Sequence, residues 1–106
     1  MHFVFPSKTI EFAKGDVAEA SAVIYQLDNE PVVNVRFSPV KAKEFGLATG
    51  RNVGNKMKIL VCGRLISEPV IRTSIEGGAV IISGNFNLPE AQTLANVLMT
   101  GVCVEG

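Results

Sequence analysis

Residues 31–39 read PVVNVRFSP, and this stretch predicts a strand followed at once by a helix. Apolar side chains at positions 33, 35 and 37 would share one side of the strand, and the side chains at 32, 34 and 36 the other. Such alternation is typical of a strand covered on one face. A Ser hydroxyl can cap an exposed helix amide, and proline fits the first helical turn, so Ser38-Pro39 predicts the helix start.

Further along this predicted helix, Ala42, Phe45, Thr49 and Val53 recur at helical spacing and are expected to pack on the sheet. On the other side of the quoted stretch, residues 27–31 (LDNEP) predict a turn. Residues 17–25 before it alternate and predict a partner strand. For residues 1–12 we expect a short edge strand or an extended lead-in, since Pro6-Ser7 breaks the apolar pattern.

The second half of the chain predicts more strands and a second helix. Residues 56–62 and 64–71 indicate a hairpin with a tight turn at Cys62-Gly63, and residues 79–83 a further strand. Asn87 and Glu90 have the spacing of a capping box, which predicts the start of the second helix. Gly101 is placed to end that helix.

These elements predict an α+β fold with a largely antiparallel sheet of four to five strands and two helices packed on one face. The chain has 106 residues, of which 47% are hydrophobic. A chain of this length buries about 65% of its unfolded surface, enough for one core. We therefore expect a single, soluble domain over residues 1–106.

Charge and hydropathy exclude several classes of protein. Ten Lys and Arg balance ten Asp and Glu, so no net charge attracts a nucleic acid. The longest apolar runs are far shorter than the roughly 20 residues that a membrane-spanning helix needs. Met1 to Pro6 lack the features of a signal peptide, which suggests a cytosolic protein or a piece of a longer one.

No residue pattern predicts catalysis or metal binding. His2, the one histidine, lies at the chain start, and the carboxylates lack metal-ligand spacing. Cys62 and Cys103 form no CxxC motif, which leaves two thiols or one disulfide open. We expect no catalytic, cofactor-binding or metal residues and no cofactor. A sheet edge around Val32 to Phe37 or Ala79 to Ser83 would suit an extended peptide.

Residues 31–101 also carry an ordered series of motifs that resembles a known family. Taken singly they are turn glycines and core aliphatic residues, but their order is specific. The series consists of Pro31-Val32-Val33, Phe37, Ala42-Lys43, Phe45, Thr49, Asn52, Gly54, Ile59, Val61, Gly63, Ile66-Ser67, Pro69-Val70-Ile71, Ile75, Gly77-Gly78, Ser83-Gly84-Asn85-Phe86, Glu90-Ala91, Leu94-Ala95 and Leu98. It is similar to the head subdomain of the first periplasmic domain of the SecD and fused SecDF protein-export proteins.

This resemblance implies a non-enzymatic head module of an accessory component of the Sec translocon. Its implied partners are unfolded preprotein and, in a longer chain, the rest of SecD/SecF and SecYEG. The implied location is the periplasmic or extracytoplasmic face of the cytoplasmic membrane. The family usually has Asp where this chain has Cys62, and its proton-carrying membrane helices are absent here, so substrate contact is the one role expected to carry over.

Two other functions fit the residues. A stand-alone, cytoplasmic structural or assembly protein could keep the head fold and self-associate through an open sheet edge. A small enzyme could use Cys62 as a reactive thiol, although no cationic neighbour is evident from the sequence to lower its pKa.

Overall fold

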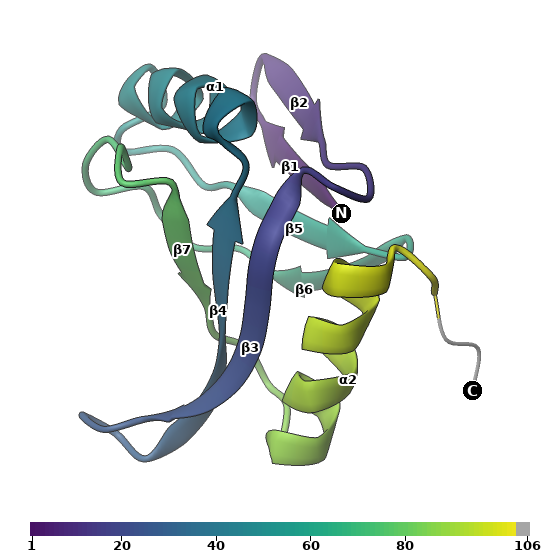
Figure 1. Cartoon of the computed structure of the whole chain (residues 1–106). Coiled ribbons are helices and arrows are strands. Elements are labelled where there is room, and N and C mark those ends of the chain that lie inside the picture. Colours follow the sequence, from purple (N-terminus) through teal and green to yellow (C-terminus); the bar gives the residue numbers. More distant parts are fainter. Residues whose placement is uncertain (104–106) are drawn as a thin grey trace.

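The computed structural model describes residues 1–103, which form two antiparallel sheets and two helices (Figure 1). The predicted α+β class is thus confirmed. In chain order the elements are β1 (His2–Phe5), β2 (Lys8–Glu11), β3 (Val17–Tyr25), β4 (Glu30–Phe37), α1 (Pro39–Gly50), β5 (Lys58–Val61), β6 (Arg64–Ser67), β7 (Ala79–Ile82) and α2 (Leu88–Thr100).

The grouping of the strands differs from the single sheet of four to five strands that we expected. Four strands pair in the order β2-β1-β5-β6, here named sheet A, and three in the order β3-β4-β7, named sheet B. The helices do not share one face of one sheet. Helix α1 lies across one end of the molecule, and α2 lies alongside β3 (Figure 1). Strand patterns in a sequence indicate which face is buried, but they do not name the partner strand.

The N-terminal residues form a hairpin of two strands, of which β2 is the expected edge strand, whereas β1 is internal and not a lead-in. Strand β1 lies between β2 and β5, and Phe3 stands opposite Ile10 on one side and Ile59 on the other. Pro6-Ser7 forms the turn of this hairpin. Because Phe3 and Phe5 are almost fully buried, burial of their rings favours this central position.

Four phenylalanines connect the two sheets through the core. The Phe3 ring of sheet A lies 4.9 Å from that of Phe12 and 5.2 Å from that of Phe45 on α1. The Phe37 ring of sheet B lies 4.7 Å from Phe12 and 5.1 Å from Phe45. Tilted and edge-on aromatic pairs at such distances are favourable. Both sheets and α1 therefore share one buried cluster.

Helix α1 begins at Pro39 as predicted, but it differs from the prediction in its cap and at its end. Ser38 is the N-cap residue, but its side chain makes no cap hydrogen bond. The helix ends at Gly50, and Val53 beyond it is 52% exposed rather than packed on the sheet. Thr49 is fully buried as expected, and its hydroxyl accepts a hydrogen bond of 2.9 Å from the amide of Ile75. This bond ties α1 to the segment that leads into β7.

Helix α2 has the predicted ends. The Asn87 side chain accepts a hydrogen bond from the Glu90 amide, and the Glu90 side chain accepts one from the Asn87 amide, each at 2.9 Å. Gly101 ends the helix in the left-handed conformation with φ 73°, and its amide donates to the carbonyl of Val97. The capping box and the C-terminal glycine are both confirmed.

Candidate functional site

Strand β7 forms an edge of sheet B. One of the two predicted edges, Val32 to Phe37, is wrong, because β4 lies between β3 and β7. Val32, expected on the open side of that strand, is also buried. Strand β7, within the other predicted edge, pairs only with β4 among the residues that the structure describes. Its second side is therefore the position at which a further strand could pair.

The register of β7 shows which backbone groups face this edge. The Phe37 amide donates to the Gly78 carbonyl at 2.8 Å, so these two opposed residues form a hydrogen-bonded pair. Hydrogen-bonded and non-bonded pairs alternate along an antiparallel ladder. Val80 follows Gly78 by two residues and lies opposite Val35, so its backbone N–H and C=O groups also face β4. The N–H and C=O groups of Ala79 and Ile81 consequently point away from β4, toward the open edge.

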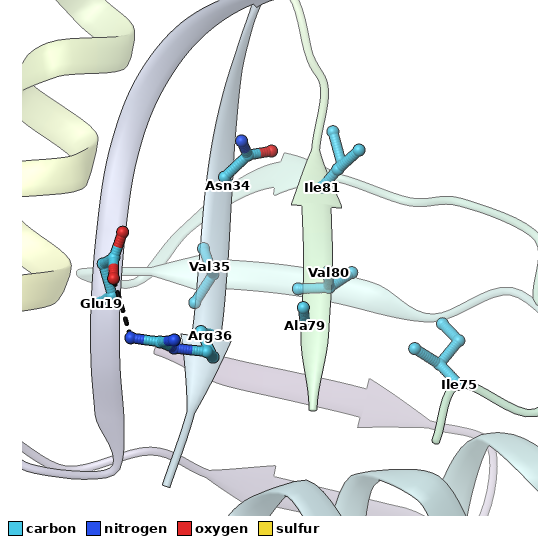
Figure 2. A pocket seen from close by; sticks show the side chains of 8 residues that line it. All are labelled: Glu19, Asn34, Val35, Arg36, Ile75, Ala79, Val80 and Ile81. Carbon is cyan, nitrogen blue, oxygen red and sulfur yellow. Dashed lines mark hydrogen bonds and ion pairs between the residues drawn. The ribbon is translucent and has the colours of Figure 1, made fainter. Parts of the chain in front are cut away.

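A shallow hollow of about 590 Å³ lies beside this edge, over β4 and β7. Five of its eight lining residues are apolar, and one of them, Ile81, is 50% exposed. Figure 2 shows β7 on one side of β4 and β3 on the other. The lining residues are Glu19, Asn34, Val35, Arg36, Ile75, Ala79, Val80 and Ile81.

An ion pair borders the hollow on its β3 side. The Arg36 guanidinium donates to the Glu19 carboxylate at 2.8 Å, and Figure 2 shows the two side chains extending toward each other across the strands. Both side chains are about 60% exposed, so the pair contributes little to stability. The surface thus combines a free strand edge, apolar side chains and a solvated polar border.

A second groove of about 530 Å³ lies between β6 and α2, and its lining includes Leu65, Phe86 and Pro89. Strand β6 ends sheet A, but the loop before α2 passes close to it. A Cβ atom at Gly84 would lie 2.8 Å from the Ile66 carbonyl oxygen. This contact requires glycine and shows that the loop lies directly against the backbone of β6.

The other two terminal strands have neighbours alongside. Helix α2 lies beside β3 (Figure 1). Strand β2 is linked to α1 by an ion pair of 3.5 Å between Lys8 and Glu44. We therefore take β7, the terminal strand beside the 590 Å³ hollow, as the candidate edge for an added strand.

Within the described residues, the histidine and the carboxylates are spread over the fold. The His2 imidazole lies 3.8 Å from the Glu11 carboxylate on the neighbouring strand. Within residues 1–103, no three His, Cys, Asp or Glu side chains are grouped so as to hold a metal ion. General acid–base or metal chemistry needs such convergent groups.

Cys62 is bonded to Cys103 in a disulfide, which decides between the two alternatives that the sequence left open. The two Cα atoms lie 5.8 Å apart. A cysteine nucleophile acts as a thiolate, and the bonded sulfur of Cys62 is not one. The interpretation as an enzyme with a reactive Cys62 thiol therefore does not fit this structure. Spacing alone could not pair the cysteines, since the bond depends on how α2 packs.

Two groups away from β7 have shifted pKa values. A hydrogen bond from Lys41 lowers the pKa of Glu44 below its ordinary value, with smaller contributions from the charges of Lys41 and Lys8. Burial lowers the pKa of the Met1 amino group. The Glu44 shift belongs to the ion pairs that link α1 to the N-terminal hairpin.

Comparison with known proteins places the whole of this arrangement in one family. The family model of the SecDF P1 head subdomain matches residues 3–103, so the match includes β1 and β2. SecD of Calditerrivibrio nitroreducens is 43% identical over 83 residues, which cover 78% of this chain and 16% of that protein. SecDF of Thermus thermophilus is 40% identical over 86 residues, which cover 81% of this chain and 12% of that protein.

Two solved SecDF structures resemble the fold. One, described as a membrane component that enhances protein export, has a TM-score of 0.75 and 39% identity over 80% of this chain and 38% of the other. SecDF in a super-membrane-facing form has a TM-score of 0.76 and 34% identity over 92% of this chain and 14% of the other.

The chain thus spans only a small part of these relatives, which are named as protein translocase subunits. No helix within residues 1–103 is long and apolar enough to cross a membrane. The family model covers nearly all of the chain, and its match agrees with both sequence relatives and solved structures. The chain belongs to the SecDF P1 head subdomain family.

Proposed function

We propose that the chain is the non-catalytic head module of a Sec protein-export accessory subunit, and that it contacts extended preprotein along the free edge of β7. The observation that carries this proposal is that the backbone N–H and C=O groups of Ala79 and Ile81 face the open edge of β7. A mainly apolar hollow lies beside them. An extended chain offers backbone groups of its own, and strand addition needs nothing else for affinity. Family membership supports the export role.

The chemistry of the edge fits a partner of varied sequence. Backbone hydrogen bonds are the same for every preprotein, so Ala79 and Ile81 would bind without selecting a sequence. The exposed Ile81 side chain and the hollow beside it offer shallow apolar contact to alternate side chains of the added strand. Such a surface binds weakly and releases readily, as a translocating chain requires.

The module would work on the extracytoplasmic side of the membrane. Disulfides form and persist in oxidising compartments such as the bacterial periplasm and are rare in the cytosol. The Cys62–Cys103 bond supports this location. In a longer chain the module would work beside SecF and SecYEG.

The test is a binding titration on an Ile81→Pro variant. Proline removes the outward N–H of residue 81 and leaves the ladder toward β4 intact, since proline is tolerated where the N–H of an edge strand faces solvent. We expect binding of a fluorescein-labelled, extended peptide of alternating apolar and polar residues, measured by anisotropy, to weaken about fivefold or more.

The matched control is Ile81→Val, which keeps the donor and the branched side chain and should bind within about twofold of the parent chain. Circular dichroism would establish that the proline variant is folded. A folded proline variant that binds the peptide as tightly as the parent chain would refute a role for this edge. A stable dimer in sedimentation velocity, with no peptide binding, would favour the assembly protein instead.

A further inference from the structure

The disulfide joins two points of the fold that are far apart in sequence. Cys62 lies in the turn between β5 and β6 with φ 53°, and Cys103 lies two residues after Gly101, the last cap of α2. The cysteines are 41 positions apart, and β6, β7 and α2 all lie between them. The bond therefore connects the tip of sheet A with the end of the helix that packs alongside β3.

Two hydrogen bonds hold the start of the segment that carries Cys103, and its Gly101 backbone lies close to Lys14. The Gly101 amide donates to Val97 at 2.8 Å, and the Val102 amide donates to the Thr100 hydroxyl at 3.2 Å. Both bonds lie within the end of α2 and its cap. Val102 is 64% exposed and Cys103 is also exposed. Among the described residues, the disulfide is the link that fixes this segment to the β5–β6 turn.

The bond is also accessible to a reacting thiol. Cys62 is exposed like Cys103. A hollow of about 220 Å³ lies beside the bond, and both cysteines, Gly63 and Lys14 line it. Thiol–disulfide exchange requires an approach to one of the two sulfurs, and a cationic group nearby favours the thiolate form.

We propose that Cys62 and Cys103 are a redox-sensitive clasp, which a dithiol–disulfide oxidoreductase of an oxidising compartment closes. When closed, the clasp fixes the direction in which the chain leaves α2 relative to sheet A. When reduced, it frees residues 102 and 103 from the β5–β6 turn and leaves α2 held by packing and its caps. This role goes beyond the peptide contact proposed for β7 and does not depend on it.

The closing reaction uses the oxidoreductase as its electron acceptor. The thiolate of one cysteine attacks the disulfide of the oxidised enzyme, which forms a mixed disulfide and releases one enzyme thiolate. The second cysteine, as thiolate, then attacks the sulfur of the first cysteine in the mixed disulfide. The Cys62–Cys103 bond forms, the mixed disulfide breaks, and the second enzyme thiolate is released. The two cysteines lose two electrons and two protons in total, and the enzyme disulfide is reduced to a dithiol.

The test compares the oxidised and the reduced 106-residue chain. After incubation in oxidised glutathione, maleimide labelling of the unfolded chain and mass spectrometry should find no label, and two labels after reduction with dithiothreitol. Amide exchange of residues 97–103 should become about tenfold faster or more on reduction, because the end of α2 opens locally. Exchange in β1 and β2 should stay unchanged. The midpoint of thermal unfolding should fall by about 10 °C or more.

The control is the double variant Cys62→Ser, Cys103→Ser, whose exchange should match the reduced parent chain in both buffers. If this variant does not fold, the reduced parent chain alone decides. Two free thiols in oxidised glutathione would overturn the proposal. Equal exchange of residues 97–103 in the oxidised and reduced chains would overturn it as well.

Discussion

At the scale of single residues, Glu44 connects α1 to the N-terminal hairpin. Its carboxylate accepts a hydrogen bond of 3.1 Å from Lys41 one turn earlier and pairs with Lys8 of β2 at 3.5 Å. The side chain is 34% exposed, so solvent screens much of the attraction. The hydrogen bond from Lys41 is the main cause of the lowered pKa of Glu44.

We predict that Glu44→Gln lowers the free energy of unfolding by about 0.5–1 kcal/mol at pH 7. Because the pKa of Glu44 is lower in the folded chain than its ordinary value of 4.5, its contribution is fully present above pH 4.5. It is lost as the pH falls through the lowered pKa. Urea unfolding of both chains at pH 7 and in strong acid near pH 2 should show the difference at neutral pH and its loss in acid.

Glu68→Gln is the matched control, since Glu68 is exposed and forms no ion pair among residues 1–103. It should change the stability by less than about 0.5 kcal/mol at either pH. A Glu44→Gln chain that is equally destabilised at both pH values would show that packing, and not the ion pairs, explains the effect.

At the scale of elements, α2 could be predicted in full because its signals are local. Asn87, Glu90 and Gly101 act within their own turns. The N-terminal hairpin could not be predicted in this way, because β1 pairs with β5, which lies more than fifty residues later in the chain. The ring of Phe3 packs against Phe37 and Phe45, and that of Phe12 against Phe37, and these contacts between distant residues leave no local pattern in the sequence.

The reciprocal hydrogen bonds at the start of α2 predict the cost of removing its cap. Asn87→Ala should lower the free energy of unfolding by about 1 kcal/mol, because the Glu90 amide loses its acceptor. Asn96→Ala, a change of the same type on the exposed middle of the helix, should be neutral or slightly stabilising. Chemical denaturation of both variants checks this, and equal effects at the two positions would contradict the capping role.

At the scale of the whole molecule, the sequence indicated that a sheet edge was available but not which strand formed it. Both candidate segments alternate or carry branched residues, and only the pairing order reveals that β4 is internal and β7 terminal. The division into two sheets was not predicted for the same reason, since the strand patterns do not name the partner strands. The disulfide likewise follows from the packing of α2 and not from cysteine spacing.

A strand added to the β7 edge would lie on the opposite side of sheet B from β3. The backbone N–H and C=O groups of Ala79 and Ile81 point away from β4. At the edge of β6, in contrast, the loop at Gly84 lies against the strand. A bound extended peptide should therefore continue sheet B and leave sheet A unchanged.

The measurement that tests this account most directly is NMR mapping of backbone amides during titration with the extended peptide. We predict that the amides of Ala79 and Ile81 shift most and become protected from solvent exchange, because they gain hydrogen bonds to the added strand. Shifts confined to the groove between β6 and α2, around Leu65 and Phe86, would contradict the assignment of the binding edge to β7. So would the absence of any shift at saturating peptide.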